Sequence, residues 1–92
     1  MTFVWEPAAR GDLRRLDRDT AMRILLALTR YGEVGDGDVK RLTDREGLYR
    51  LRVGKWRVFF DLDTPGEARI HGIDNRGQSL LTRRFLLDPG KR

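Results

Sequence analysis

The sequence predicts an α+β fold in which an N-terminal strand and a two-helix hairpin pack on a small, mainly antiparallel sheet. Three patterns support this prediction. The first residues alternate as a strand does, two stretches with helical periodicity follow, and the second half of the chain contains a strong β-hairpin pattern. Ninety-two residues suffice for one modest hydrophobic core, so residues 1–92 are expected to form a single domain.

The first third of the chain is predicted to form the strand and both helices. Thr2–Glu6 alternates around Phe3 and Trp5, and Pro7 suits the first turn of a helix. Apolar residues then recur at helical spacing in two series, which are Ala9, Leu13 and Leu16 followed by Ala21, Ile24, Leu25, Leu28 and Tyr31. Asp17 or Asp19 can cap the second helix, and Gly32 is its expected end. Both apolar stripes are expected to pack on the sheet.

The most informative stretch is Tyr49–Asp61, which reads YRLRVGKWRVFFD. A two-residue turn at Gly54-Lys55 would pair Val53 with Trp56, and every other pair follows from that register. Because side chains alternate between the two faces of a strand, one face is apolar: Tyr49, Leu51, Val53, Trp56, Val58, Phe60 and Leu62. The opposite face carries Arg50, Arg52 and Arg57.

Opposed like charges on a sheet are destabilising, so this arginine cluster favours an anionic ligand. The alternative is a solvated face in a chain that is rich in arginine throughout. Lys and Arg number 19 against 14 Asp and Glu, a net charge of +5, which favours a polyanionic partner.

The remaining segments are less regular. Gly35–Asp38 is expected to be a loop without the ligand spacing of a calcium site, and Val39–Thr43 a short strand or an extended connection. A turn at Pro65-Gly66 leads to a strand at Ala68–Asp74, where a bulge near Gly72 would allow both Ile70 and Ile73 to face the core. Asp74 and Arg76 would then join the arginine face. The periodicity of Ser79–Leu87 does not distinguish a helix from a strand. This segment is expected either to pack on the edge of the sheet or to form a lid or a partner-docking segment.

Composition excludes several classes of site. The chain has no cysteine and one histidine, so neither a disulfide nor a metal site is expected, and no cofactor is implied. No signal-like segment and no apolar run of ~18 residues is present, so a cytoplasmic protein is expected.

The order of elements, together with LYRLRVGKWRVFFDLD and the later Asn75-Arg76-Gly77, resembles the RelE/ParE superfamily of bacterial toxin–antitoxin toxins. The resemblance covers most of the chain and favours the RelE branch. It implies a RelE-like toxin that cuts messenger RNA on the ribosome without a metal, and a cognate antitoxin as partner. The chain departs from the branch in having arginine at the first two basic positions and no tyrosine after Tyr49.

The resemblance places the family's basic positions on Arg50, Arg52, Arg57 and Arg76. Arg57, Arg76 and Arg52 are the expected catalytic residues, which would stabilise the transition state, and Arg50, Lys55 and Arg52 are the expected RNA-binding residues. A general base is not evident, because a guanidinium with a pKa above ~12 cannot act as one. Glu46 and His71 are the main candidates for that role, with Asp74 and Lys55 as further ones.

Two alternative functions stay open at the sequence level. One is a ParE-type inhibitor of DNA gyrase without nuclease activity, which would explain the missing base and tyrosine. The other is a catalytically decayed RNA-binding module that keeps the fold and the charge.

Overall fold

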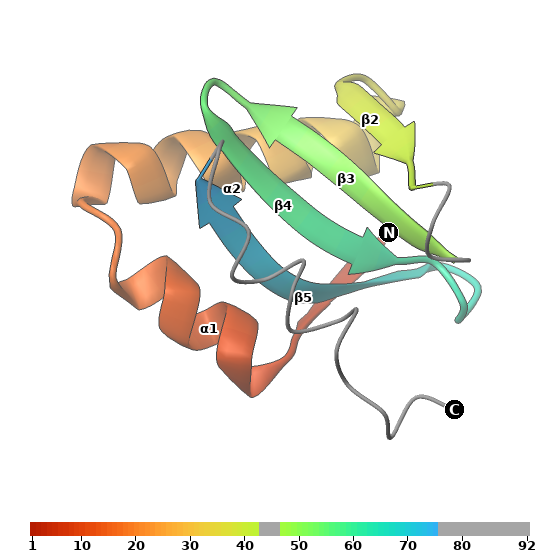
Figure 1. The fold of residues 1–92 in the computed structure, drawn as a ribbon. Coiled ribbons are helices and arrows are strands. Elements are labelled where there is room, and N and C mark those ends of the chain that lie inside the picture. Colours follow the sequence, from red (N-terminus) through yellow and green to blue (C-terminus); the bar gives the residue numbers. More distant parts are fainter. Residues whose placement is uncertain (43–46, 76–92) are drawn as a thin grey trace.

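A computed structural model describes residues 1–42 and 47–75 of the chain. Along the chain the elements are β1 (Thr2–Trp5), α1 (Pro7–Arg14), α2 (Arg18–Val34), β2 (Asp38–Arg41), β3 (Leu48–Val53), β4 (Trp56–Asp61) and β5 (Glu67–Asn75). The five strands form one sheet in the order β1-β5-β4-β3-β2, and both helices lie on the same face of it (Figure 1). Only β1 and β5 are parallel, which confirms the predicted α+β fold with a mainly antiparallel sheet.

The central hairpin has the predicted register. Val53 pairs with Trp56, Arg52 with Arg57, and so on to Leu48 with Asp61, around a turn in which Gly54 has φ 63°. All seven residues of the predicted apolar face belong to the main core or pack against it. The helices add Ala9, Ile24 and Leu28, which are buried, so the core lies between the helices and this face of the sheet.

The second helix begins as predicted and ends later than predicted. Asp17 is the N-cap, and its carboxylate accepts hydrogen bonds from the backbone N–H and the hydroxyl of Thr20. The helix continues past Gly32 to Val34 and is closed by Gly35 in the left-handed conformation, φ 74°. The prediction that Gly32 ends the helix was therefore wrong. A Cβ on Gly32 would lie 2.9 Å from Cζ of Phe3, so close packing against β1 accounts for this glycine.

Strand β5 contains the predicted bulge. Gly72 pairs with Phe59 and Ile70 with Phe60, which leaves His71 as the extra residue on β5. Ile70 and Ile73 consequently both face the core, as predicted. The parallel pairing of β5 with β1 stops at Ile70. Beyond this residue, the same edge of β5 is hydrogen-bonded to helix α1, because the Asp12 carboxylate accepts a hydrogen bond from the Ile73 N–H at 3.0 Å.

The edge strand β2 starts at Asp38, within the segment that was expected to be a loop, and Val39 packs against the core. Asp38 therefore belongs to the sheet. The predicted strand or connection extended to Thr43, which lies outside the described residues, as does the tail Ser79–Leu87. No helix in the described ranges has the length and apolar character needed to cross a membrane.

The glycines of the two helices provide a test of the packing. Gly32→Ala should lower the free energy of unfolding by ~1–2 kcal/mol, because overpacking against Phe3 costs about 1–3 kcal/mol and the gain in helix propensity offsets only up to about 1 kcal/mol. In Gly11→Ala the new Cβ meets only the end of the Arg15 side chain at 3.6 Å, so this control should be stabilising. Urea denaturation of both variants measures the difference, and equal effects of the same sign would contradict the explanation for Gly32.

Candidate functional site: the arginine face

The face of the sheet opposite the helices carries the three arginines of the central hairpin, and we call it the arginine face. Arg50 and Arg52 come from β3, and Arg57 from β4 stands directly across from Arg52. The neighbouring strands add charges, because residues paired across strands share a face. In the register of the sheet, Asp38 and Lys40 of β2 are paired with Arg52 and Arg50, and Asp74 of β5 is paired with Arg57.

Two carboxylates lie among these arginines. Asp38 bridges two of them, with Oδ2 3.4 Å from Nε of Arg52 and Oδ1 3.8 Å from Nη2 of Arg50. Asp74 Oδ2 lies 3.5 Å from Nη2 of Arg57. Part of the repulsion between the arginines is therefore compensated by the protein itself.

The two carboxylates differ in their environment. The Asp74 side chain is only 6% exposed, whereas that of Asp38 is 56% exposed at the sheet edge. Two further contacts position Arg57. Its Nη2 donates a hydrogen bond to the backbone carbonyl of Asn75 at 3.4 Å, and its guanidinium carbon lies 5.8 Å from the centre of the Phe59 ring. Arg57 and Asp74 thus form a fixed, partly buried pair, while Asp38 is accessible to solvent.

The arginine face also contains a small apolar cluster. Leu48 and Phe59 are buried there, and Leu42 packs against them. The predicted register already placed Phe59 opposite Arg50 on this face, but the cluster with Leu48 and Leu42 was not predicted. Because Phe59 is buried, it supports the neighbouring side chains instead of offering a free ring to a ligand.

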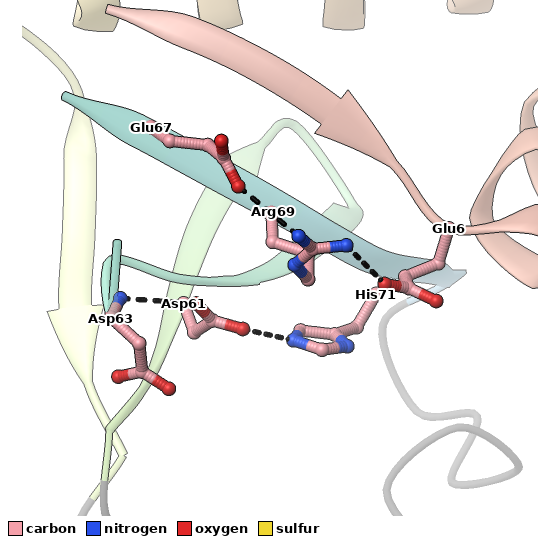
Figure 2. Close-up of polar contacts among 6 residues, drawn as sticks. All are labelled: Glu6, Asp61, Asp63, Glu67, Arg69 and His71. Atoms are coloured by element: carbon pink, nitrogen blue, oxygen red, sulfur yellow. Dashed lines mark hydrogen bonds and ion pairs between the residues drawn. The ribbon is translucent and has the colours of Figure 1, made fainter. Parts of the chain in front are cut away.

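The bulge in β5 brings His71 to Asp61, which also lies on the arginine face (Figure 2). His71 Nε2 lies 2.5 Å from Asp61 Oδ2, and the other oxygen of Asp61 accepts a hydrogen bond from the Asp63 N–H at 3.1 Å. A carboxylate can only accept, so Nε2 carries the hydrogen and Nδ1 is the basic nitrogen of the neutral ring. Asp61 therefore sets both the tautomer and the orientation of His71.

Beside this pair, Arg69 is held between two acidic residues. Its guanidinium donates to Glu6 at 2.8 Å and to Glu67 at 3.2 Å (Figure 2). The hydrogen bond to Glu6 raises the pKa of Arg69 above its usual value. The arginine face is thus divided into a cationic half around Arg50, Arg52 and Arg57, and a half near β1 in which acidic groups balance Arg69.

The structure thus brings together Arg50, Arg52, Arg57 and Asp74 as the register predicted, with His71 on the adjacent bulge. Lys55 lies in the turn, where its ammonium is 5.8 Å from the ring centre of Trp56, a residue of the core face. Glu46 and Arg76 lie outside the described residues. Across residues 1–42 and 47–75, no three His, Asp or Glu side chains converge as metal ligands would.

Sequence reasoning missed three residues of this site. Asp38 was assigned to a loop, and only its pairing with Arg52 reveals its position. Asp61 could have been placed on the arginine face, since it lies four residues after Arg57 on the same strand. Its contact with His71, however, depends on the bulge. Arg69 was not singled out, because its partner Glu6 is 63 residues away in the sequence.

Comparison with known proteins finds similarity at the level of structure. No protein-family model and no curated protein matches the sequence. The isolated E. coli RelE toxin superposes with a TM-score of 0.68 at 11% identity, covering 92% of this chain and 94% of that one. The toxin-antitoxin complex RelBE2 from Mycobacterium tuberculosis superposes with a TM-score of 0.53 at 26% identity, covering 82% of this chain and 96% of that one. The chromosomal ParDE TA system from P. aeruginosa superposes with a TM-score of 0.60 at 18% identity, covering 83% of this chain and 96% of that one.

The different burial of the two carboxylates predicts different effects on stability. Asp74→Ala should lower the free energy of unfolding by about 3 kcal/mol, because it leaves Arg57 without its partly buried partner. Asp38→Ala, which removes the same group from an exposed pair, should cost less than about 1 kcal/mol. Chemical denaturation measures both values. Comparable losses in the two variants would show that Asp38 is also part of the fixed structure.

The contact between His71 and Asp61 should be visible by NMR, since the chain has only one histidine. The Nε2–H proton, which is hydrogen-bonded to Asp61, should give a downfield signal that exchanges slowly with water. Asp61→Ala should abolish this signal. Asp63→Ala should keep it, because Asp63 contributes only its backbone N–H. A signal that survives in Asp61→Ala would contradict the assigned hydrogen bond.

Proposed function

The chain has the fold of the RelE/ParE superfamily of toxins, and from this premise we propose that it is the toxin of a type II toxin–antitoxin pair and an mRNA endonuclease that acts on the ribosome. The observation that carries the proposal is the placement of three arginines and an oriented histidine on one face of the sheet. Binding of RNA and cleavage of RNA would then use adjacent parts of the same surface.

Metal-independent cleavage of RNA needs three groups. A base removes the proton of the 2′-hydroxyl, cations stabilise the charge that develops on the phosphate during in-line attack, and an acid protonates the departing 5′-oxygen. Arg57 and Arg52, which face each other across β3 and β4, are the proposed source of the stabilising charge, together with Arg76. Arg50 and Lys55, with Arg52, are proposed to bind the RNA backbone, since guanidinium groups bind phosphate in a bidentate manner.

His71 is the proposed general base. Its Nε2–H is directed to Asp61, so Nδ1 would take the proton from the 2′-hydroxyl and the resulting imidazolium would be stabilised by the carboxylate. The bulge places His71 next to the pair Phe59–Gly72, which is two pairs along the ladder from the pair Arg57–Asp74. The observation that supports His71 among the candidates Glu46, His71, Asp74 and Lys55 is its contact with Asp61.

A cognate antitoxin is the proposed protein partner. The similarity to the RelBE2 complex supports this assignment, since that structure is a toxin together with its antitoxin. The net charge of +5 favours an acidic antitoxin segment, which would fold as it binds. The cytoplasm, where messenger RNA is translated, is the proposed location.

A second candidate function is ParE-type inhibition of DNA gyrase without cleavage of RNA. It is favoured by the similarity to the ParDE system, with a TM-score of 0.60. On this alternative the arginines would bind a protein or DNA surface. The contact of His71 with Asp61 would then have only a structural role at the bulge.

Induced expression in bacteria tests the two functions against each other. The wild-type chain should arrest growth and produce new messenger RNA 5′ ends at codons occupied by ribosomes. Arg57→Gln and His71→Gln should each reduce cutting about 100-fold or more, the usual cost of losing an electrostatic or acid–base group. Arg30→Gln is the matched control, because it removes the charge of an exposed arginine on α2, and it should cut like wild type.

Folding of each variant is verified by circular dichroism before activity is compared. Intact messages together with inhibited supercoiling by gyrase would overturn the nuclease proposal and support the ParE-type function. Cutting that persists in both Arg57→Gln and His71→Gln would show that the reaction uses other residues.

A further inference from the structure

Asp38 contacts two arginines, Arg50 and Arg52, and it has no role in the proposed nuclease chemistry. We propose that Arg50 and Arg52 form a phosphate-binding subsite, and that the Asp38 carboxylate occupies it until single-stranded RNA displaces it. Asp38 would then act as a built-in competitor that limits the affinity of the free protein for RNA. The inference rests on the proposed RNA-binding role of the arginine face.

The geometry of Asp38 is that of a bridging anion. Its two oxygens are directed to different guanidinium groups, Oδ2 to Arg52 Nε and Oδ1 to Arg50 Nη2. A phosphate that binds two arginines uses its non-bridging oxygens in the same way. The carboxylate therefore lies where an RNA phosphate would make its contacts.

The contacts of Asp38 are also loose. At 3.4 and 3.8 Å they exceed the 2.7–2.9 Å that is typical of charge-assisted hydrogen bonds. The contact of Arg57 with Asp74 is also long, at 3.5 Å, but there the carboxylate is buried, whereas Asp38 is exposed. The Arg50 side chain is 13% exposed, and within the described part of the chain its Nη1 is buried with no hydrogen-bond partner, so Asp38 satisfies this guanidinium only in part. An RNA phosphodiester, which like the carboxylate carries one negative charge on two oxygens, can therefore replace Asp38 without breaking a tight pair.

The position of Asp38 allows this displacement. It is the first residue of an edge strand and its side chain is 56% exposed, so the carboxylate can rotate into solvent while β2 stays paired with β3. Lys40, the other β2 residue on this face, is paired with Arg50. Once Asp38 has left, the corner formed by β2 and β3 presents Lys40, Arg50 and Arg52 on the arginine face, and the paired residues 38–41 and 49–52 contain no other acid. Asp74 cannot leave in this way, because it is buried against Arg57.

Binding of a short single-stranded 2′-O-methyl RNA, measured by fluorescence anisotropy, tests the inference. This probe cannot be cleaved, because its 2′-hydroxyl is blocked, so the result is independent of nuclease activity. Asp38→Asn should bind the probe about 5-fold more tightly than wild type in low salt, since one unit charge at ~4 Å in water changes an interaction by about 1 kcal/mol. The gain should shrink at high salt, where exposed charges are screened.

Asp36→Asn is the matched control. It removes the same charge two residues away, but Asp36 is paired with Arg30 of α2 at 3.0 Å instead of with the arginine face. Its affinity should change less than 2-fold. An equal gain in both variants would show an effect of net charge alone and would overturn the inference, as would unchanged or weaker binding by Asp38→Asn.

Arg50→Gln/Arg52→Gln separates this inference from the proposed function. This double variant should bind the probe at least about 10-fold more weakly, and adding Asp38→Asn to it should give no further gain, because the carboxylate then has no subsite to occupy. Weakened binding in the double variant without any effect of Asp38→Asn alone would overturn only the role of Asp38. Undiminished binding in the double variant would overturn the RNA-binding role of the face itself.

Discussion

The structure depends on the pairing of β3 with β4 around the two-residue turn at Gly54-Lys55. This turn determines the register, and the register places apolar side chains on the helix side and arginines on the other side. A slip by one residue would move every one of these side chains to the opposite face. The hydrophobic core and the cationic site are therefore two consequences of one constraint, and neither can be changed without the other.

The register places Arg50, Arg52 and Arg57 close together, and the repulsion between these arginines is reduced in two different ways. Arg57 has a buried partner, Asp74, on the neighbouring central strand, and the pair is further held by a backbone carbonyl. Arg50 and Arg52 share an exposed carboxylate on an edge strand. The first arrangement holds one arginine in a fixed position, as the proposed chemistry requires. The second pairs Arg52, whose side chain is 55% exposed, and Arg50, which is 13% exposed, with a carboxylate at the surface, and an exposed ion pair contributes little stability.

The bulge in β5 links the fold to the proposed chemistry. By adding one residue it allows Ile70 and Ile73 both to reach the core, and it turns His71 toward Asp61 on the arginine face. The same strand continues past the end of β1, where Asp12 of α1 supplies the missing bond to its edge. Irregularity in this strand thus positions the only histidine of the chain, which a regular ladder would not direct to Asp61.

The sequence by itself determined the hairpin register, the apolar face, the bulge near Gly72 and the gathering of the arginines, because all of these follow from turn length and from alternation within one or two neighbouring strands. Only the tertiary structure decided where Asp38 lies, that Asp61 meets His71, that Glu6 holds Arg69, and that Gly32 lies inside a helix. Three of these depend on packing of another segment: β2 beside β3, β1 beside β5, and Phe3 against α2. The contact of Asp61 with His71 depends on the exact pairing of β4 with β5 around the bulge. Local patterns carry no information about such contacts, since packing between elements creates them.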